Sequence, residues 1–258
     1  MDGRGPVHPE SVYPPPIVTP FTVAFTHATP HGVLTAIHIP DSPDPVPDGV
    51  LATLPAAESE HARGLRGYRQ VQFVGGRIAL RESCLVMGVR SGAILSDDRG
   101  APLIPAGLAG SVSHKATLAV SMVARDGLGT LGVDLEDYGP QRLGIGPRVL
   151  TAVELAAIAD HPTDRRWFGI LVRFSLKEAI YKALDPYVHR YVGFHEAEVT
   201  PDVHGLAAVT LRLTPPAGPD GVARAAEGPF EVDARYDWLH GRLVTSVRIR
   251  RVKAAGAP

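Results

Sequence analysis

The strand-like segments of this chain come in groups and do not alternate with helices. Two short strand-like runs come first, a helical stretch and a hairpin follow, and two helices precede four more strand-like runs. The predicted strands cover 21–26, 33–39, 117–124, 131–136, 197–200, 206–213, 230–238 and 243–250, and the predicted helices cover 58–87, 147–159 and 164–184. This order favours an α+β fold over a parallel sheet built from βαβ units.

Two glycine-containing segments refine this prediction. Arg125-Asp-Gly127 has the composition of a turn, so 117–124 and 131–136 are expected to form a hairpin. The pair Gly75-Gly76 is expected to interrupt the first helix, because each glycine costs roughly 1 kcal/mol relative to alanine in a helix interior.

Length, charge and cysteine content exclude several classes of protein. The 258 residues suffice for one large domain or two modest ones, and a net charge of −1 predicts neither a nucleic acid nor a membrane as partner. The single cysteine, Cys84, cannot form an internal disulfide or a cysteine-based zinc site, which favours a cytoplasmic location. We see no long apolar run and no signal-peptide pattern. The Pro-rich residues 1–20 predict an irregular arm.

Two carboxylates share one face of the predicted strand Gly132-Val-Asp-Leu-Glu136. Side chains alternate along a strand, so Asp134 and Glu136 point away from Leu131, Val133 and Leu135. Hard oxygen ligands of this kind suit Mg²⁺, which also borrows oxygens from substrate phosphates. Taken alone, the segment is more typical of a solvated strand face.

The helix predicted over 164–184 places an acidic residue in line with apolar ones. Its apolar stripe passes through Glu178 between Phe174 and Tyr181, in alternating steps of four and three residues. A glutamate in such a stripe is costly unless it is paired or bound to a metal. Lys182 lies one turn further on, so an ordinary Glu–Lys pair at the edge of the stripe is the alternative.

A third group of residues suggests anion binding. Arg69, Phe73, Arg77 and Arg81 recur every four residues, which places three arginines along one side of a helix. The alternative is a solvated basic face. His114, by itself, is more typical of a structural histidine. Gly127-x-Gly129-x-x-Gly132 matches the dinucleotide fingerprint but leads into a strand where that motif requires a helix, so we discount it.

Together these segments resemble the signatures of the 4'-phosphopantetheinyl transferase superfamily. Gly132-Val-Asp-Leu-Glu136 and Phe174-Ser-Leu-Lys-Glu-Ala-Ile-Tyr-Lys182 match its two main motifs, with Glu178 lying 44 residues after Asp134. Gly110-Ser-Val-Ser-His114 is similar to its Ser-x-Ser-His element, and Arg99-Gly-Ala-Pro102 to its Lys/Arg-Gly-x-Pro turn. The arginine stripe is similar to the basic helix of the branch that activates enterobactin synthase and mycobacterial carrier proteins. The resemblance spans roughly residues 66–200.

The resemblance implies a pseudo-twofold α+β fold with two similar halves, 21–124 and 125–258, each with a sheet and a packed helix, and coenzyme A (CoA) in the cleft between them. It implies transfer of phosphopantetheine from CoA to a serine of an apo acyl or peptidyl carrier protein, in polyketide, nonribosomal peptide or fatty-acid synthesis. Adenosine 3',5'-bisphosphate is released.

The resemblance also assigns roles to individual residues. Asp134, Glu136 and Glu178 are expected to hold Mg²⁺, with Mn²⁺ as the alternative, and Asp134, Glu178 and Lys182 to act in catalysis. The residues expected to bind CoA are Arg69, Arg77, Arg81, Arg99, Ser113, His114 and Lys182. The chain departs from the family pattern at Arg99, where lysine is common, at Ala101, and at Phe174, where many members have tryptophan.

Two other functions fit the same carboxylates. One is a metal-dependent phosphohydrolase acting on CoA or nucleotides, which needs no protein acceptor. The other is a non-catalytic module that binds carriers, although the retention of all three carboxylates and Lys182 argues against lost chemistry. A monomer is expected.

Overall fold

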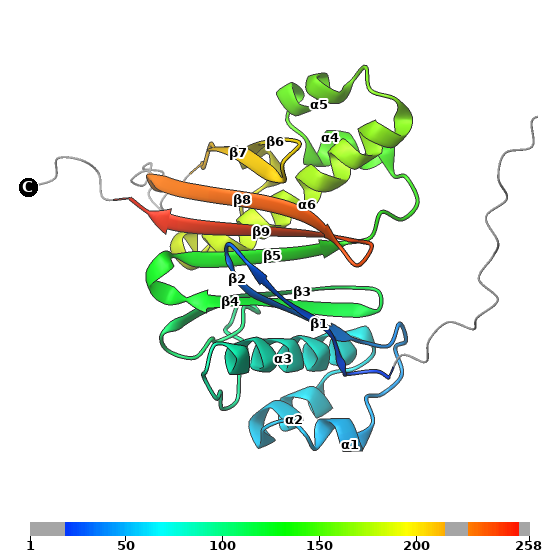
Figure 1. The fold of residues 1–258 in the computed structure, drawn as a ribbon, viewed down its shortest axis with the longest axis vertical. Helices are drawn as coiled ribbons and strands as arrows, with labels where there is room; N and C mark the ends of the chain where they lie inside the picture. Colours follow the sequence, from blue (N-terminus) through cyan, green and yellow to red (C-terminus); the bar gives the residue numbers. More distant parts are fainter. Residues whose placement is uncertain (1–18, 215–226, 253–258) are drawn as a thin grey trace, which may run out of the picture.

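The structure, a computed structural model, describes residues 19–214 and 227–252. The arm predicted over residues 1–20 lies outside the described residues, apart from its last two. Two antiparallel sheets with helices make up the fold, so the expected α+β class is confirmed (Figure 1). Among the described residues, no helix has the length and apolar character needed to cross a membrane.

The first sheet has four strands in the order β1-β2-β4-β3 and carries one long helix, α3. The elements are β1 Val23–Thr29, β2 Gly32–His38, α1 Asp48–Leu51, α2 Ala56–Gly64, α3 Tyr68–Val86, β3 Leu108–Lys115 and β4 Leu118–Arg125. Helix α3 packs against β2, β3 and β4. The buried face of this helix, including Val71, Val74 and Leu80, forms the core with the sheet.

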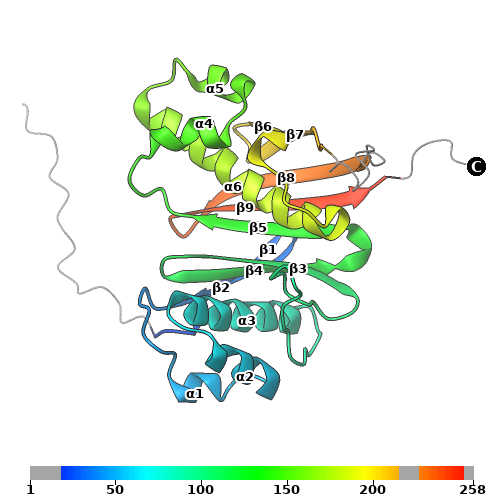
Figure 2. The same cartoon turned by 180° about the vertical axis from the view of Figure 1, so that it is seen from behind.

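The second sheet has five strands in the order β5-β9-β8-β7-β6 and carries the longest helix, α6. The elements are β5 Thr130–Glu136, α4 Gly146–Val149, α5 Ala152–Ile158, α6 Thr163–Val188, β6 Ala197–Pro201, β7 Leu206–Leu211, β8 Phe230–Leu239 and β9 Arg242–Arg251. Short 3₁₀ turns lie at Asp126–Leu128, Leu143–Ile145 and Phe194–Glu196. Helices α3 and α6 lie on the same side of the molecule, each over its own sheet (Figure 2).

Three sequence-based expectations about elements were wrong. Segments β4 and β5 form no hairpin, because β4 pairs with β2 and β3 while β5 pairs with β9. The first helical stretch breaks over residues 65–67, between α2 and α3, and not at Gly75-Gly76, which lie inside α3; Gly67 in this break has a φ of 59°. The stretch 147–159 is two short helices, α4 and α5, and Thr151 starts the second with a capping box.

The glycine pair of α3 has a packing reason. A Cβ on Gly75 would lie 2.3 Å from Cγ2 of Ile39, and one on Gly76 would lie 2.9 Å from Cγ2 of Val112. Because real Cβ contacts are longer than this, only glycine lets α3 lie this close to the sheet. The close packing outweighs the lower helix propensity of glycine.

The two sheets share a core and are joined by polar contacts. Buried residues of both sheets, including Leu34, Met122, Val133 and Val244, form one apolar cluster. Strands β3 and β5 lie side by side without forming a ladder, and the backbone N–H of Val133 donates to Oγ of Ser111 at 3.0 Å.

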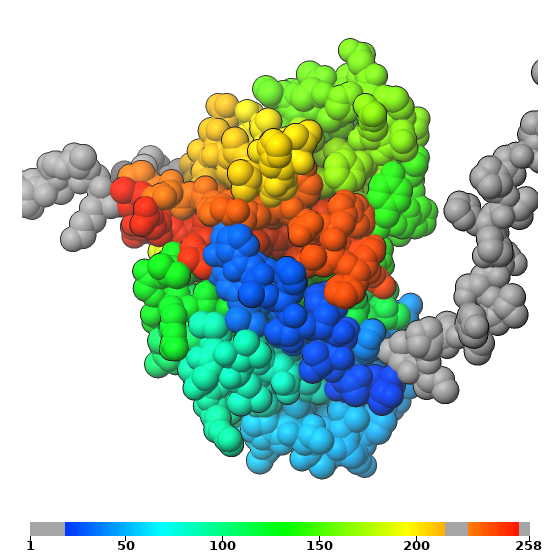
Figure 3. All heavy atoms as spheres, in the orientation of Figure 1, coloured from blue at the N-terminus to red at the C-terminus, as the bar shows by residue number. Residues whose placement is uncertain are grey.

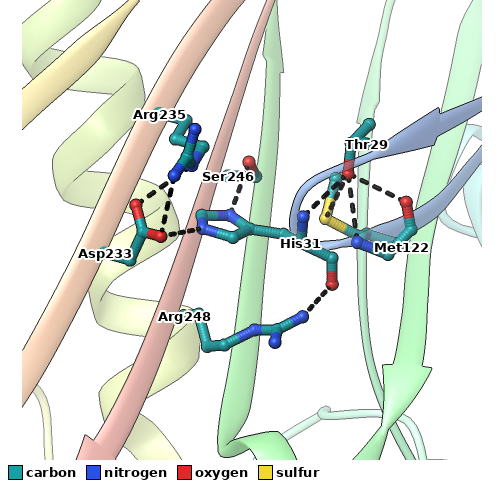
Figure 4. A network of polar contacts seen from close by, with 8 residues as sticks. Thr29, His31, Met122, Asp233, Arg235, Ser246 and Arg248 are labelled. Carbon is teal, nitrogen blue, oxygen red and sulfur yellow. Dashed lines mark hydrogen bonds and ion pairs between the residues drawn. The ribbon is translucent and has the colours of Figure 1, made fainter.

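A second junction lies at the turn between β1 and β2, on the face seen in Figure 3, where this hairpin packs against β8 and β9. The buried imidazole of His31 contacts Oγ of Ser246 through Nδ1 at 2.9 Å and lies 3.3 Å from Oδ2 of Asp233 through Nε2 (Figure 4). Arg248 donates to the backbone carbonyl of His31. The first sheet is therefore tied to the second on both sides of the shared core.

Candidate active site at the junction of the two sheets

The packing of α6 on β5 brings the predicted motifs together. Three contacts follow one another along the two elements. Oγ1 of Thr130 donates to the carbonyl of Ala183 at 2.7 Å, Gly132 touches Ala179, and Oγ of Ser175 donates to Oδ2 of Asp134 at 2.8 Å. Two strand residues span about 6.7 Å and four helix residues about 6 Å, so the antiparallel elements stay in step.

Gly132 sets the distance between these elements. A Cβ placed there would lie 1.8 Å from the carbonyl oxygen of Ala179 and 2.7 Å from its carbonyl carbon. The obstacle is backbone, which cannot turn aside as a flexible side chain can. Gly132 is therefore required by the contact with α6 and not by a dinucleotide. Gly129, another glycine of the same discounted motif, has a φ of 104°, a backbone conformation that favours glycine.

Asp134 is the centre of the site and is buried. Its Oδ1 accepts from Oγ of Ser113 at 2.8 Å and from Nζ of Lys182 at 2.9 Å, and its Oδ2 accepts from Ser175. Lys182 also donates to Ser113 at 3.0 Å and to the carbonyl of Val133 at 2.9 Å. The site thus combines β3 and β5, from different sheets, with α6.

The other two predicted metal ligands lie beside Asp134. Glu136 is buried, and its Oε2 pairs with Nζ of Lys115 at 2.5 Å. Burial raises the pKa of Glu136, Lys115 opposes this shift, and the charge of Asp134 adds to it. Glu178 is half-buried; burial raises its pKa, the charge of Asp134 adds to the rise, and Lys182 opposes it. The charge of Asp134 therefore acts on both glutamates.

The donor set suits Mg²⁺ in chemistry, since all three groups are hard oxygen ligands and a divalent cation would offset the charge that Asp134 places on the two glutamates. As they stand, however, no three His, Cys, Asp or Glu side chains within the described ranges are grouped closely enough to hold an ion. Lysines occupy oxygens of Asp134 and Glu136. Lys115 contacts only Oε2 of Glu136, so Oε1 of this carboxylate is not part of the pair.

A cavity of about 660 Å³ adjoins this cluster, with Lys182 in its wall. Its other walls come from the loop around Arg99–Ile104, the start of β3 and the C-terminal end of α6. Arg99 closes one side of it by pairing with Asp185 at 2.5 Å and by donating to the hydroxyl of Tyr181 at 3.4 Å. The cavity is thus bounded by both halves of the chain and reaches the cluster at Lys182, whereas Glu178 lines a separate cavity of about 80 Å³.

Three of the residues expected to bind CoA lie at this place, and Arg99 lies at the cavity. Ser113 and Lys182 bond directly to Asp134, as described above. His114 is exposed on β3, but the protein atoms around its ring partly desolvate the charged imidazolium. This desolvation lowers the pKa of His114, and the nearby charge of Lys182 lowers it further. These positions surround the junction of the sheets from β3, α6 and the loop before β3.

The basic stripe is arranged differently from the expectation. The structure does not bring its three arginines to one anion-facing surface. Arg69 is exposed at the start of α3, whereas Arg77 is buried, donates to Oγ of Ser96 at 2.6 Å and lies over the ring of Phe73. Burial lowers the pKa of Arg77 to about 10. Arg81 pairs with the fully buried Glu58 at 2.5 Å.

Sequence reasoning missed four residues of this site. Ser175 stands inside the helix motif but carries no pattern of its own, and Thr245 and Lys115 lie on other strands. Asp185 follows Lys182 by three residues, and that spacing on a helix could have indicated a shared face. The predicted stripe on α6 was also incomplete, because buried residues surround this helix on several sides.

Comparisons with known proteins show what this chain is similar to. The family model for the "4'-phosphopantetheinyl transferase N-terminal domain" matches residues 58–124, and that for the "4'-phosphopantetheinyl transferase superfamily" matches residues 130–222. The 4'-phosphopantetheinyl transferase Svp from Streptomyces mobaraensis is 31% identical over 207 residues, which cover 79% of this chain and 81% of Svp. The match to the first family model ends within β4, in the first sheet, and the match to the second begins with β5, in the second sheet.

Two further matches cover less of the chain. The 4'-phosphopantetheinyl transferase PptT from Mycobacterium tuberculosis is 32% identical over 134 residues, which cover 51% of this chain and 58% of PptT. A crystal structure of the holo-(acyl-carrier-protein) synthase from Thermotoga maritima aligns with a TM-score of 0.37 at 20% identity, over 49% of this chain and 65% of that one.

Proposed function

Because this chain belongs to the 4'-phosphopantetheinyl transferase superfamily, we propose that the junction of its two sheets is the site where phosphopantetheine passes from CoA to a carrier-protein serine. An enzyme of this class moves the phosphopantetheine group onto carrier proteins. The observation that carries the location is the Lys182–Asp134–Ser113 cluster, which joins β3, β5 and α6 beside two further carboxylates and a cavity.

In the proposed reaction, separate residues of this chain handle the serine proton and the phosphate charge. The carrier serine oxygen forms a bond to the β-phosphorus of CoA, and the bond from that phosphorus to the bridging oxygen breaks, which releases adenosine 3',5'-bisphosphate. Glu178, or a water that it positions, takes the serine proton. Lys182 lies within the cluster where it offsets phosphate charge.

Asp134, Glu136 and Glu178 would hold Mg²⁺, which neutralises charge on the pyrophosphate when bound. Arg99, Ser113 and His114 would line the path of the CoA phosphates. Arg77 and Arg81 are committed to Ser96 and Glu58, so we assign them to holding α3 in place while Arg69 stays available to an anion. The cytoplasmic location and the monomeric state stay predictions.

The decisive experiment weighs carrier proteins by mass spectrometry after incubation with the enzyme, CoA and Mg²⁺. A panel of apo carriers from fatty-acid, polyketide and nonribosomal peptide systems should show which carrier gains one phosphopantetheine. EDTA should abolish the gain, and Glu178→Gln should lower turnover by about 100-fold or more, the scale of a positioned base.

The alternatives give different products. A phosphohydrolase would consume CoA at the same rate with or without a carrier. A non-catalytic module would bind the carrier and leave its mass unchanged. Either result contradicts the transferase reaction at this site.

A further inference from the structure

A chain of buried hydroxyl groups reaches Asp134 from the far side of the site. Thr245 on β9 is the cross-strand partner of Asp134 on β5, and Ser175 of α6 lies against both. Oγ of Ser175 is 2.9 Å from Oγ1 of Thr245 and 2.8 Å from Oδ2 of Asp134. Both hydroxyl residues are fully buried, at 0% exposure.

The direction of these hydrogen bonds follows from counting protons. An ionised carboxylate only accepts, so the single proton of the Ser175 hydroxyl is given to Asp134. The Thr245 hydroxyl must then donate to Oγ of Ser175. The result is a directed relay from Thr245 through Ser175 to Asp134, in which each bond polarises the next.

The same count shows how many acceptor positions of the Asp134 carboxylate remain unfilled. A carboxylate provides about four acceptor positions, two on each oxygen. Ser113 and Lys182 fill those of Oδ1, and Ser175 fills one on Oδ2. A single position on Oδ2 remains, and the relay fixes the direction in which it points.

We infer that Ser175 and Thr245 are positioning residues that hold Asp134 in the orientation in which Oδ2 receives the metal ion. The inference rests on the proposed function, because it presumes that Asp134 is a metal ligand. Neither hydroxyl touches the reacting groups, and both are fully buried. Hydrogen-bonding partners behind a metal ligand typically contribute 10- to 100-fold to metal affinity or activity.

The test measures metal binding without turnover. Mn²⁺ is titrated into the full-length protein with CoA and no carrier, and bound Mn²⁺ is followed by electron paramagnetic resonance. Thr245→Val keeps the side-chain shape without the hydroxyl, Thr245→Ser restores the hydroxyl, and Ser175→Ala removes the next link. We expect Thr245→Val and Ser175→Ala to raise the Kd for Mn²⁺ about 10-fold or more, and Thr245→Ser to restore it.

The chain offers a matched control in its first half. The hydroxyls of Ser83 and Ser121 lie 2.8 Å apart, and both residues are fully buried, but they have no connection to Asp134. Ser121→Ala should lower the free energy of unfolding in urea by an amount similar to Thr245→Val while leaving the Kd for Mn²⁺ unchanged. This comparison separates a loss of positioning from a loss of stability.

The outcomes distinguish two failures. If the wild type binds Mn²⁺ and Thr245→Val and Ser175→Ala bind it equally well, the relay is structural and the inference is wrong. If the wild type binds no Mn²⁺ in the presence of CoA, the proposed metal site is wrong and the inference falls with it. If Ser175→Ala does not fold, the comparison of Thr245→Val with Thr245→Ser still shows whether the relay affects metal binding.

Discussion

At the scale of single residues, several buried charged and polar groups pair with residues of other elements. Lys177 and Glu154, both buried, pair at 2.6 Å and join α6 to α5, and Glu154 also accepts from the backbone N–H of Val199 on β6. His31 joins the first sheet to the second in the same way. Removing one member of such a pair leaves the other unsatisfied, which costs more than the intact pair contributes.

The buried His31 predicts a dependence of stability on pH. Burial lowers its pKa below the ordinary value of 6.5; the charge of Asp233 opposes this shift, and those of Arg248 and Arg235 add to it. Because the unfolded chain takes up the proton at higher pH than the folded protein does, stability is lost as pH falls from about 6.5 towards the lowered pKa. His31→Gln cannot take up this proton.

The measurement is urea unfolding of the wild type and His31→Gln between about pH 7.5 and pH 5. The wild type should lose more stability than His31→Gln over the window just below pH 6.5, so the difference in free energy of unfolding between the two should narrow. Parallel stability curves for the two proteins would show that the protonation of His31 is not linked to folding.

At the scale of elements, the close contact between β5 and α6 determines the site. Thr130, Gly132 and Asp134 on the strand meet Ala183, Ala179 and Ser175 on the helix. A shift of α6 away from β5 would separate Lys182 and Ser175 from Asp134 at once. The geometry of the site is therefore coupled to the packing of these two elements.

Gly132→Ala tests this coupling. The added methyl group meets the backbone of Ala179, so α6 must move or the strand must bend, and overpacking of this kind typically costs about 1–3 kcal/mol or more. We expect lower stability in urea and a large loss of transferase activity in the fraction that folds. Gly127→Ala is the matched control, because a Cβ there has no neighbour within 4 Å and should change neither property much. Equal behaviour of the two variants would show that the close approach at Gly132 is not required.

How much of this arrangement could be predicted from sequence depended on whether the interaction was local. The common face of Asp134 and Glu136 and the helix that carries Glu178 and Lys182 follow from side-chain periodicity. The strand pairing of β5 with β9 joins residues more than a hundred positions apart, so a local turn wrongly suggested a hairpin. The positions of the Arg77 and Arg81 side chains depend on their partners Ser96 and Glu58, which lie outside α3 and cannot be identified from residue spacing within this helix.

At the scale of the whole molecule, the site needs both halves of the chain. Ser113 comes from the first sheet and Asp134 from the second, and the apolar cluster between the sheets includes residues of both. The net charge of −1 means that any attraction for CoA must arise locally, near Lys182, Arg99 and His114. Binding at such a junction should stabilise the entire protein.

We expect differential scanning calorimetry to show a single unfolding transition that CoA and Mg²⁺ move to higher temperature. At a ligand concentration about 100 times its Kd, binding adds about 2.7 kcal/mol, which corresponds to roughly 5–10 °C for a protein of this size. Asp134→Asn should reduce the shift, because it removes a ligand charge from the site. Two transitions, of which CoA moves only one, would show that the halves unfold independently and that CoA is held by one of them.

The matched spacing of β5 and α6 also limits where this chain can change in length. Deleting one residue from β5 between Gly132 and Asp134 would turn the side chain of Leu135 towards α6, and deleting one from α6 between Ser175 and Lys182 would rotate the later residues by about 100° around the helix. Insertions in the connection 137–162 affect neither interval. Natural chains of this architecture should therefore differ in length within that connection and keep the intervals Gly132–Asp134 and Ser175–Lys182 constant. These two intervals can then serve as fixed reference points when distant sequences are aligned.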